Sequence, residues 1–282
     1  MNRTSQSSPR VSVVIPAYNN AAYLACTLDS VLTQDFDDYE VVVADHSSSD
    51  ATREILEVFA THPRVRILSS TPAGGGALAN WNRVSQHARG DLLKLVCGDD
   101  LIAPSALARQ VAALDANPRA VMVACRRDLI DAKGQPLLRN WGLRGLDGIV
   151  SGRDAMRAVV RAGSNLFGEP ACVLFRRAAL ERAGGWDNAF PYLIDQATYC
   201  RILEQGDLVA LQDPLACFRI SASQWSVRLV REQAAQARHF HAALRDRHPG
   251  LLSRADLIIG NLRATAMAYT RRLVYLSMWR RL

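Results

Sequence analysis

The sequence contains no long apolar segment. Across its 282 residues, no run approaches the roughly 18 consecutive apolar residues that a membrane-spanning helix requires. Residues 1–10 are polar and rich in serine, and they lack the apolar core of a secretory signal. We therefore expect a cytoplasmic protein that meets a membrane only peripherally, at its inner face.

Cysteine and histidine are few and scattered. Residues 74–76 are three glycines, but they match neither the dinucleotide-binding fingerprint nor a P-loop, which needs a lysine after its glycine. The histidines show no metal-ligand spacing beyond His239-x-His241, and we predict that they lie on the surface. We predict buried, reduced thiols rather than disulfides, because no C-x-x-C pair occurs and most of the cysteines lie in apolar runs. The six are Cys26, Cys97, Cys125, Cys172, Cys200 and Cys217.

The composition is that of a globular protein with an uneven charge distribution. Hydrophobic residues make up 49% and charged residues 22%, and the length allows one large α/β domain or two small ones. The net charge is +7, and residues 201–282 carry 13 Lys and Arg against 6 Asp and Glu. A basic tail suggests an acidic partner surface. We do not expect nucleic-acid binding, because the excess is confined to the tail and no nucleic-acid-binding module is present.

Apolar runs alternate with helical patterns along the chain. The first half predicts strands at residues 11–15, 40–44, 65–68 and 92–96 with helices between them, which favours a mostly parallel α/β sheet. Further strands are predicted at 120–125 and 171–175, with an edge strand at 207–211, and residues 140–151 resemble a long loop of the kind that forms lids. The chain beyond residue 223 is predicted to be helical.

Polar residues follow three of the predicted strands where each one ends. Tyr18 and Asn19 follow the first strand, Asp45 follows the second, and Asp99 with Asp100 follows the fourth. The carboxyl ends of parallel strands share one rim of a sheet, where α/β proteins bind ligands. Two adjacent carboxylates at such a rim suit a cation and the phosphates that it neutralises. The alternative is a solvated turn in which the two acids only cap the next helix.

Five sequence motifs follow one another along the chain. Residues 11–19 form an apolar strand followed by Pro-x-Tyr-Asn. The remaining four are an apolar strand with a Ser-rich loop ending in Asp (41–50), Asn-Trp-Asn-Arg (80–83), Cys-Gly-Asp-Asp (97–100), and Gly-Gly-Trp-Asp (184–187) followed by Asp195 and Arg201. In this order they resemble the motifs of family 2 glycosyltransferases with the GT-A fold, which have Asp-x-Asp-Asp at the fourth motif. The resemblance extends from residue 11 to about residue 218.

The resemblance implies an enzyme that binds a nucleotide-sugar and a divalent metal, Mn²⁺ or Mg²⁺, and transfers the sugar with inversion. Asp99 would be the principal metal ligand with Asp100 in support, Asp195 would be the general base, and Arg201 would be structural. Glu169 and Trp186 are weaker candidates for contact with the acceptor; a loop turn and core packing are the respective alternatives. The residues assigned to the nucleotide-sugar are Pro16, Ala17, Tyr18, Asn19, Asp45, Asn82 and Asp99.

The same resemblance divides the chain into a flexible N-terminus (1–10), a GT-A domain (11–222) and a helical C-terminal extension (223–282). The expected donor is a UDP-sugar, with a dTDP-sugar next. The expected acceptor is a saccharide or lipid-linked saccharide of cell-envelope polysaccharide or glycolipid synthesis. The extension, which mixes apolar residues and arginines, either lies on anionic lipid or packs on the domain or a partner subunit. The oligomeric state stays open.

Three departures from the family pattern leave other functions open. Cys97 stands where the first acid of the metal motif is usual, His46 replaces a frequent second Asp, and Ile194 replaces the Glu before the base. A degenerate chain that only binds nucleotide or scaffolds a complex is therefore one alternative. A nucleotidyltransferase is another, although residues 17–22 lack the basic loop that it would normally use. For the single residues, the alternatives are that Asp45 only caps the following loop and that Asp195 is the N-cap of its helix.

Overall fold

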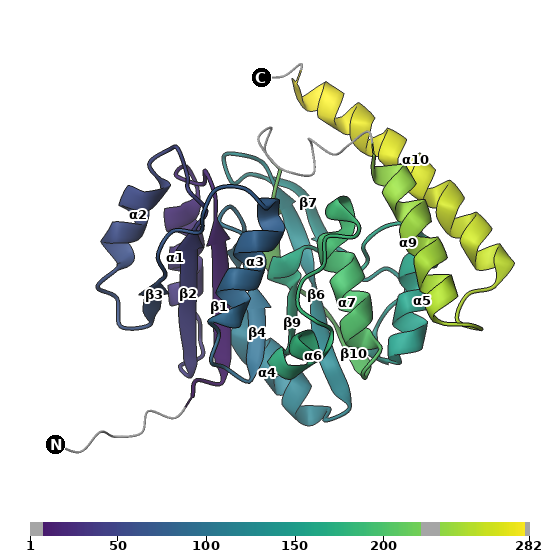
Figure 1. The fold of residues 1–282 in the computed structure, drawn as a ribbon, viewed down its shortest axis with the longest axis horizontal. Coiled ribbons are helices and arrows are strands. Elements are labelled where there is room, and N and C mark those ends of the chain that lie inside the picture. The colour runs from purple at the N-terminus through teal and green to yellow at the C-terminus, as the bar shows by residue number, and fades with distance from the viewer. Residues whose placement is uncertain (1–7, 221–231, 280–282) are drawn as a thin grey trace.

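The computed structural model describes residues 8–220 and 232–279, with side chains of the last helix described as far as residue 271. Figure 1 shows a central sheet flanked by helices, with two helices side by side at one end. The elements in chain order are β1 Val11–Ala17, α1 Leu24–Leu32, β2 Tyr39–Asp45, α2 Thr52–Phe59, β3 Val65–Ile67, α3 Gly76–Gln86, β4 Leu92–Leu95, β5 Leu101–Ile102, α4 Ala106–Ala116, β6 Ala120–Ile130, β7 Pro136–Trp141, β8 Gly148–Val150, α5 Gly152–Ala162, the 3-10 helix η1 Pro170–Cys172, β9 Val173–Arg176, α6 Arg177–Arg182, the 3-10 helix η2 Pro191–Leu193, α7 Ile194–Leu203, β10 Asp207–Arg219, α9 Gln233–Arg247 and α10 Arg254–Trp279.

The strands form one sheet whose first half is parallel and whose second half is mixed. Its order is β3-β2-β1-β4-β9-β6-β10-β5, with β7 beside β6 and β8 beside β10. Strands β1 to β4 pair in parallel, as the alternation of strands and helices predicts. β9 runs antiparallel to both of its neighbours, β4 and β6. The carboxyl ends of β1, β2, β4 and β6 therefore meet at one rim of the sheet, where β9 begins.

The second half of the sheet differs from the sequence prediction in three ways. β9 is antiparallel because the chain is already at the rim when it enters this strand, held there by contacts of residues 165 and 169 that are described below. The predicted edge strand at 207–211 is the start of β10, which lies inside the sheet between β6 and β5. The predicted loop at 140–151 contains the end of β7 and all of β8, which have little apolar periodicity because their side chains are mostly exposed.

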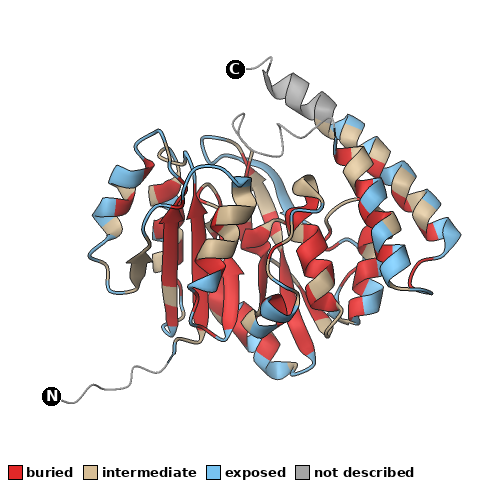
Figure 2. Ribbon diagram, viewed as in Figure 1, coloured by how far each residue is buried: buried red, intermediate tan, exposed pale blue. Residues whose placement is uncertain are grey.

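The core lies between the sheet and the helices that cover its two faces. Figure 2 shows the central strands as almost wholly buried, with the exposed residues on the outer faces of the helices. β1 is buried at every position, which explains its continuous apolar run rather than an alternating pattern. One polar exception is Lys94 in β4, whose ammonium group is completely buried. Its Nζ donates to Gln110 Oε1 at 2.9 Å and to the carbonyl oxygen of Ala171 at 2.6 Å.

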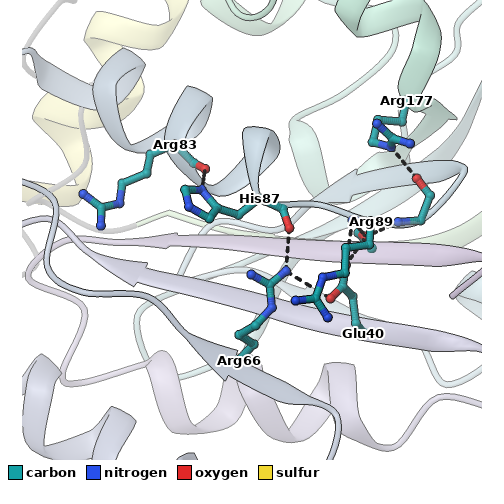
Figure 3. Close-up of polar contacts among 8 residues, drawn as sticks. Glu40, Arg66, Arg83, His87, Arg89 and Arg177 are labelled. Carbon is teal, nitrogen blue, oxygen red and sulfur yellow. Dashed lines mark hydrogen bonds and ion pairs between the residues drawn. The ribbon is translucent and has the colours of Figure 1, made fainter. Parts of the chain in front are cut away.

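A polar network lies where the parallel strands begin, at the end of the sheet opposite to the rim (Figure 3). The Glu40 carboxylate accepts hydrogen bonds from the Ser12 hydroxyl and the Arg89 backbone N–H, and it forms an ion pair with Arg66 at 3.1 Å. Arg177 Nε donates to the carbonyl oxygen of Gly90. A pocket of about 480 Å³ opens beside this network and contains none of the predicted site residues. The network ties the α3–β4 connection to β1 and β2. The predicted site residues lie at the opposite end of these strands, at the rim.

The C-terminal helices pack on the domain. Gly260 of α10 lies so close to α5 that a Cβ atom would come within 2.2 Å of the Val160 carbonyl oxygen. Asp256, which is fully buried, forms ion pairs with Arg157 and Arg161 of α5. The described residues of this extension therefore pack on the domain through one face of α10, and the lipid alternative concerns the exposed face of the same helix. The predicted flexible N-terminus lies largely outside the described residues, and the predicted boundary at 222–223 lies outside them entirely.

Candidate active site

The loop after β1 is built by side chains that bind backbone groups. Asn19 has a positive φ of 50°, and its Oδ1 accepts a hydrogen bond from the N–H of Ser49 at 2.9 Å. Asn20 Oδ1 accepts one from the N–H of Tyr18 at 2.8 Å. A Cβ atom on Gly98 would come within 2.6 Å of the same Asn20 oxygen, so any other residue there would have to displace the Asn20 amide. The loops after β1 and β4 are thus in contact, and the Tyr18 side chain is left 53% exposed.

Asp45, at the end of β2, is buried and accepts hydrogen bonds from the backbone N–H and the hydroxyl group of Ser48. The next residue, His46, contacts the Gly74 carbonyl oxygen at 2.8 Å through Nε2, and its ring lies 5.9 Å from that of Tyr18. His46 therefore connects the second strand to the triple-glycine loop. Through these contacts, the segments that follow β1 and β2 form one side of the rim.

Asp100 is the most buried carboxylate of the rim. It is 1% exposed, its Oδ1 accepts a hydrogen bond from the backbone N–H of Arg219 at 3.1 Å, and its Oδ2 has no hydrogen-bond partner among the described residues. Burial and the negative charge of Asp99 raise the pKa of Asp100 well above its usual range. Arg219 also donates from Nε to the Asp99 carbonyl oxygen at 2.9 Å and lies over the Tyr23 ring. Arg219, from the end of β10, therefore holds the acidic motif in place.

Asp195 lies in the first turn of α7, on the other side of the rim. Asn165 Nδ2 donates to its Oδ2 at 2.9 Å, and the backbone N–H of Gln196 donates to its Oδ1 at 2.7 Å. Burial, together with the negative charge of Glu169, raises the pKa of Asp195 to about 7. Glu169 is itself in an ion pair with the buried guanidinium of Arg127. The two hydrogen bonds fix the orientation of the Asp195 carboxylate.

Cys97 lies among these acids. Burial raises the pKa of its thiol well above the usual range, and the charges of Asp100, Asp99, Asp195 and Glu169 raise it further. The carboxylates that follow β4, that of α7 and that of the segment before η1 are thus near enough for their charges to act on one thiol. The structure brings these predicted site residues together, although they are up to about a hundred positions apart in the sequence.

Trp186 does not face this site, which corrects the suggestion that it stacks on a sugar. The side chain is 3% exposed, and its ring lies 4.9 Å from Trp81 and 6.0 Å from Tyr199. The turn at Gly184 and Gly185, both with positive φ, directs the chain into the core. Core packing, the alternative, is therefore what the structure has.

Asn82 is engaged by the same turn. Its Oδ1 accepts from the backbone N–H of Trp186 at 3.0 Å and its Nδ2 donates to the Trp186 carbonyl oxygen at 3.2 Å. Both ends of the Asn82 amide therefore hold α3 to the turn at Gly184 and Gly185. The side chain is not placed with the residues predicted to bind the nucleotide-sugar. Arg201 is structural, as predicted, because its guanidinium binds Asp187 at 2.7 Å.

Sequence reasoning missed three residues that support the site: Arg127, Asn165 and Arg219. Arg219 has a detectable signal, since it is a single arginine directly after the apolar run at 215–218. Arg127 and Asn165 have none, because each acts through a partner that is 42 or 30 residues away.

Comparisons with known proteins identify the family. The chain matches the family described as glycosyl transferase family 2 over residues 12–184. It is 30% identical over 232 residues to an uncharacterized protein, MT1568, of Mycobacterium tuberculosis, covering 79% of this chain and 71% of that one. Other curated relatives, glycosyltransferases and synthases of chondroitin and hyaluronan among them, match over 40% or less of their own length. The chain belongs to glycosyl transferase family 2 and is a glycosyltransferase.

Two solved structures share the fold. TarS from S. aureus, in complex with UDP-GlcNAc, superimposes with a TM-score of 0.68 at 18% identity and covers 88% of this chain and 69% of TarS. The mannosyltransferase PcManGT from Pyrobaculum calidifontis, in complex with GDP-Man and Mn²⁺, gives a TM-score of 0.67 at 23% identity, over 96% of this chain and 76% of PcManGT. The fold is the predicted GT-A fold with a helical C-terminal region.

Proposed function

We propose that this glycosyltransferase moves a sugar from a nucleotide-sugar to an acceptor hydroxyl group, with inversion at the anomeric carbon. The observation that carries the proposal is the placement of acids on two sides of one rim. Asp99 and Asp100 follow β4, where the Arg219 backbone N–H binds Asp100, and Asp195 lies at the start of α7, where Asn165 holds it. Inverting transfer needs charge stabilisation at the leaving diphosphate and a base at the attacking hydroxyl. Asp99 and Asp100 on one side of the site suit the charge stabilisation, and Asp195 on the other side suits the role of the base.

On the donor side, the loops after β1 and β2 form the proposed base and ribose pocket. Pro16, Ala17, Tyr18 and Asn19 line it, and Asp45 contacts the base. Support comes from the exposed Tyr18 ring and from the backbone hydrogen bonds that hold Asn19 in shape. We propose UDP as the first nucleotide and dTDP as the next, in line with the nucleoside diphosphate sugar described with TarS.

A divalent metal, Mn²⁺ or Mg²⁺, fits the acids at the end of β4. Asp100 has a buried oxygen with no hydrogen-bond partner among the described residues, and its pKa is raised by burial and by Asp99, a cost that a nearby cation offsets. Within residues 8–220 and 232–271, no three His, Cys, Asp or Glu side chains gather as a metal site. Two carboxylates completed by diphosphate oxygens are common for these ions. A bound ion offsets the charge that develops on the leaving diphosphate.

Asp195 is the proposed base. It takes the proton of the acceptor hydroxyl as that oxygen attacks the anomeric carbon from the face opposite to the diphosphate. A pKa of about 7 suits this role, because the carboxylate is ionised in about half of the molecules at neutral pH and binds the proton more strongly than an ordinary aspartate. Glu169 contributes by its charge and borders the proposed acceptor space.

The proposed acceptor is a saccharide or lipid-linked saccharide of cell-envelope polysaccharide or glycolipid synthesis. Polysaccharide synthases among the relatives support the class of product. Helix α10 exposes Ile258, Leu262 and Tyr269 at helical spacing, with Arg254 and Arg263 also exposed, a combination that suits peripheral contact with an anionic membrane. None of the described helices is long and apolar enough to cross a bilayer.

Vesicle flotation tests the membrane contact. We expect the full chain to float with vesicles containing anionic lipid, and Leu262→Glu to float less. Val58→Glu, which changes another exposed apolar residue in α2, is the matched control. Equal flotation of both variants and the wild type would exclude α10 as the contact.

Calorimetry tests the donor site. Nucleoside diphosphates and nucleotide-sugars are titrated into the wild type, Asp99→Asn and the control Asp29→Asn, which changes an exposed carboxylate of α1, with Mn²⁺ or with EDTA. We expect binding that one base favours, that EDTA weakens and that only Asp99→Asn loses. If no member of the panel binds under either condition, the rim is not a donor site and the scaffold alternative takes its place.

A further inference from the structure

Trp141 is a large aromatic residue that lies outside the core. It ends β7, which pairs with the last part of β6 at the rim end of the sheet (Figure 1). Its side chain is 47% exposed, whereas Trp81 and Trp186 pack against each other. An exposed tryptophan offers a flat apolar face to a ligand. The residues around Trp141 decide which ligand that face suits.

The strand register places Trp141 beside the Arg127–Glu169 ion pair. Trp141 lies directly opposite Arg127 in the antiparallel pairing of β7 with β6. Side chains of such opposite residues project from the same face of a sheet, with Cβ atoms about 4.5–5.5 Å apart. The Arg127 guanidinium is buried and pairs with the Glu169 carboxylate. Trp141 is therefore a neighbour of the side chain that binds Glu169.

The same ion pair connects Trp141 to the proposed base. Asn165 Nδ2 donates to Asp195 Oδ2 at 2.9 Å and to the carbonyl oxygen of the residue before Glu169 at 2.8 Å. This short segment therefore binds the base at one end and Arg127 at the other. Trp141, opposite Arg127, lies next to the segment that orients the base, on the proposed acceptor side.

The backbone on both sides of Trp141 is held by specific contacts. The Asn140 N–H donates to Asp128 Oδ1 at 2.7 Å, and the Leu143 N–H donates to the Leu166 carbonyl oxygen at 2.9 Å. Asn140 and Leu143 have positive φ angles of 53° and 51°, which are uncommon for residues other than glycine. The register of β6 and β7 also shifts next to Trp141, as in the β-bulges that redirect side chains beside active sites. The indole is thus presented on a fixed backbone.

We propose that Trp141 binds a sugar ring of the acceptor by stacking. This inference rests on the proposed function and adds a binding residue to its acceptor side. A pyranose ring has an apolar face of C–H groups, which packs on an aromatic ring, and an edge of hydroxyl groups, which bind polar side chains. The Glu169 carboxylate, 24% exposed, accepts hydrogen bonds from such hydroxyl groups. An aromatic face and a carboxylate beside one arginine therefore suit a saccharide.

An array of immobilised oligosaccharides tests the proposal on the whole protein. Its members are built from glucose, galactose, mannose, rhamnose and N-acetylglucosamine, and the protein is applied with UDP and Mg²⁺. We expect Trp141→Ala to bind the sugars that the wild type selects about fivefold more weakly or worse, and Trp141→Phe to keep most of the affinity. Leu137→Ala, which shortens another exposed side chain of β7, is the matched control and should bind as the wild type does.

Fluorine NMR shows whether the sugar contacts the indole, which a purely structural role of Trp141 would not produce. Protein labelled with 5-fluorotryptophan is titrated with the selected sugar in free form, and Trp141→Phe identifies the Trp141 signal by its absence. We expect this signal to shift while those of Trp81 and Trp186, which pack in the core, stay in place.

Three results would overturn the proposal. A sugar that binds without moving the Trp141 signal is one, and an array on which the wild type and Trp141→Ala bind alike or not at all is another. Weaker flotation of Trp141→Ala with anionic vesicles, with unchanged sugar binding, would assign β7 to the membrane instead. Calorimetry with UDP separates these results from failure of the proposed function, because a wild type that still binds UDP keeps its donor site when the stacking inference is wrong.

Discussion

The hydrogen bond from Asn165 to Asp195 sets the pH range in which the proposed base works. Asn165→Ala removes the donor that lies 2.9 Å from Asp195 Oδ2 and stabilises the ionised carboxylate. A hydrogen bond to a charged group contributes about 1.5–3 kcal/mol. At about 1.36 kcal/mol for each pKa unit, its loss raises the pKa of Asp195 from about 7 by about one to two units.

The expected result is a shifted pH–rate profile. A base works only when ionised, so activity of the wild type should rise as the pH increases through 7, and that of the variant only near pH 8–9. At pH 7 the ionised fraction falls from about one half to about 1–10%, so kcat should fall by about 5–50-fold and recover at high pH.

Initial rates of sugar transfer between pH 5.5 and 9.5 test this argument. The matched control is Asn117→Ala, which removes an amide that donates to a backbone carbonyl at the end of α4. Asn165 also donates to the Gly168 carbonyl oxygen, so Tm is measured in parallel to detect loss of that contact. A uniform loss of kcat at every pH, with the acidic limb unmoved, would refute the reasoning.

Three further predictions concern stability. Because the pKa of Asp195 is raised, the folded state is stabilised while this residue is protonated and loses that stability as the pH rises to about 7. Asp195→Asn should therefore be inactive, yet more stable than the wild type at pH 8 by about 1–4 kcal/mol. Urea unfolding measures this difference, which should be small at pH 4. Gly98→Ala places a Cβ atom 2.6 Å from Asn20 Oδ1, so we expect a loss of about 1–3 kcal/mol and weaker nucleotide binding by calorimetry. Gly260→Ala places one 2.2 Å from the Val160 carbonyl oxygen; Tm should fall while nucleotide binding is retained, and unchanged Tm would contradict the close approach of α10 to α5.

The first half of the fold was predictable because its strands are buried on both faces. β1, β2 and β4 are mostly apolar and almost wholly buried, and polar residues follow or end each of them, a pattern that identifies strands without knowledge of their partners. β7 and β8 lack this signal because their residues are mostly exposed. The direction of β9 was not predictable either, since it depends on side-chain contacts made before the strand begins.

The site was predictable only where the function lies in a local motif. Asp45, Asp99 and Asp195 occur in short patterns, whereas Asn165 and Arg127 act on partners 30 and 42 residues away. Trp186 shows a different limit. An aromatic residue after two glycines has the same sequence pattern whether it stacks on a sugar or packs among Trp81, Phe175 and Tyr199, and only the burial of its ring distinguishes the two.

The contact of Arg219 with the acidic motif also sets the order in which the site can be completed. Asp99 and Asp100 leave the ribosome early, but the residue that binds them lies 119 positions after Asp100, at the end of β10. A nascent chain that has emerged only as far as β9 can pair β1, β2 and β4. It still lacks the Arg219 backbone N–H that donates to the Asp100 carboxylate and the guanidinium that donates to the Asp99 carbonyl oxygen. The donor site is therefore finished late in synthesis, after most of the sheet that supports it.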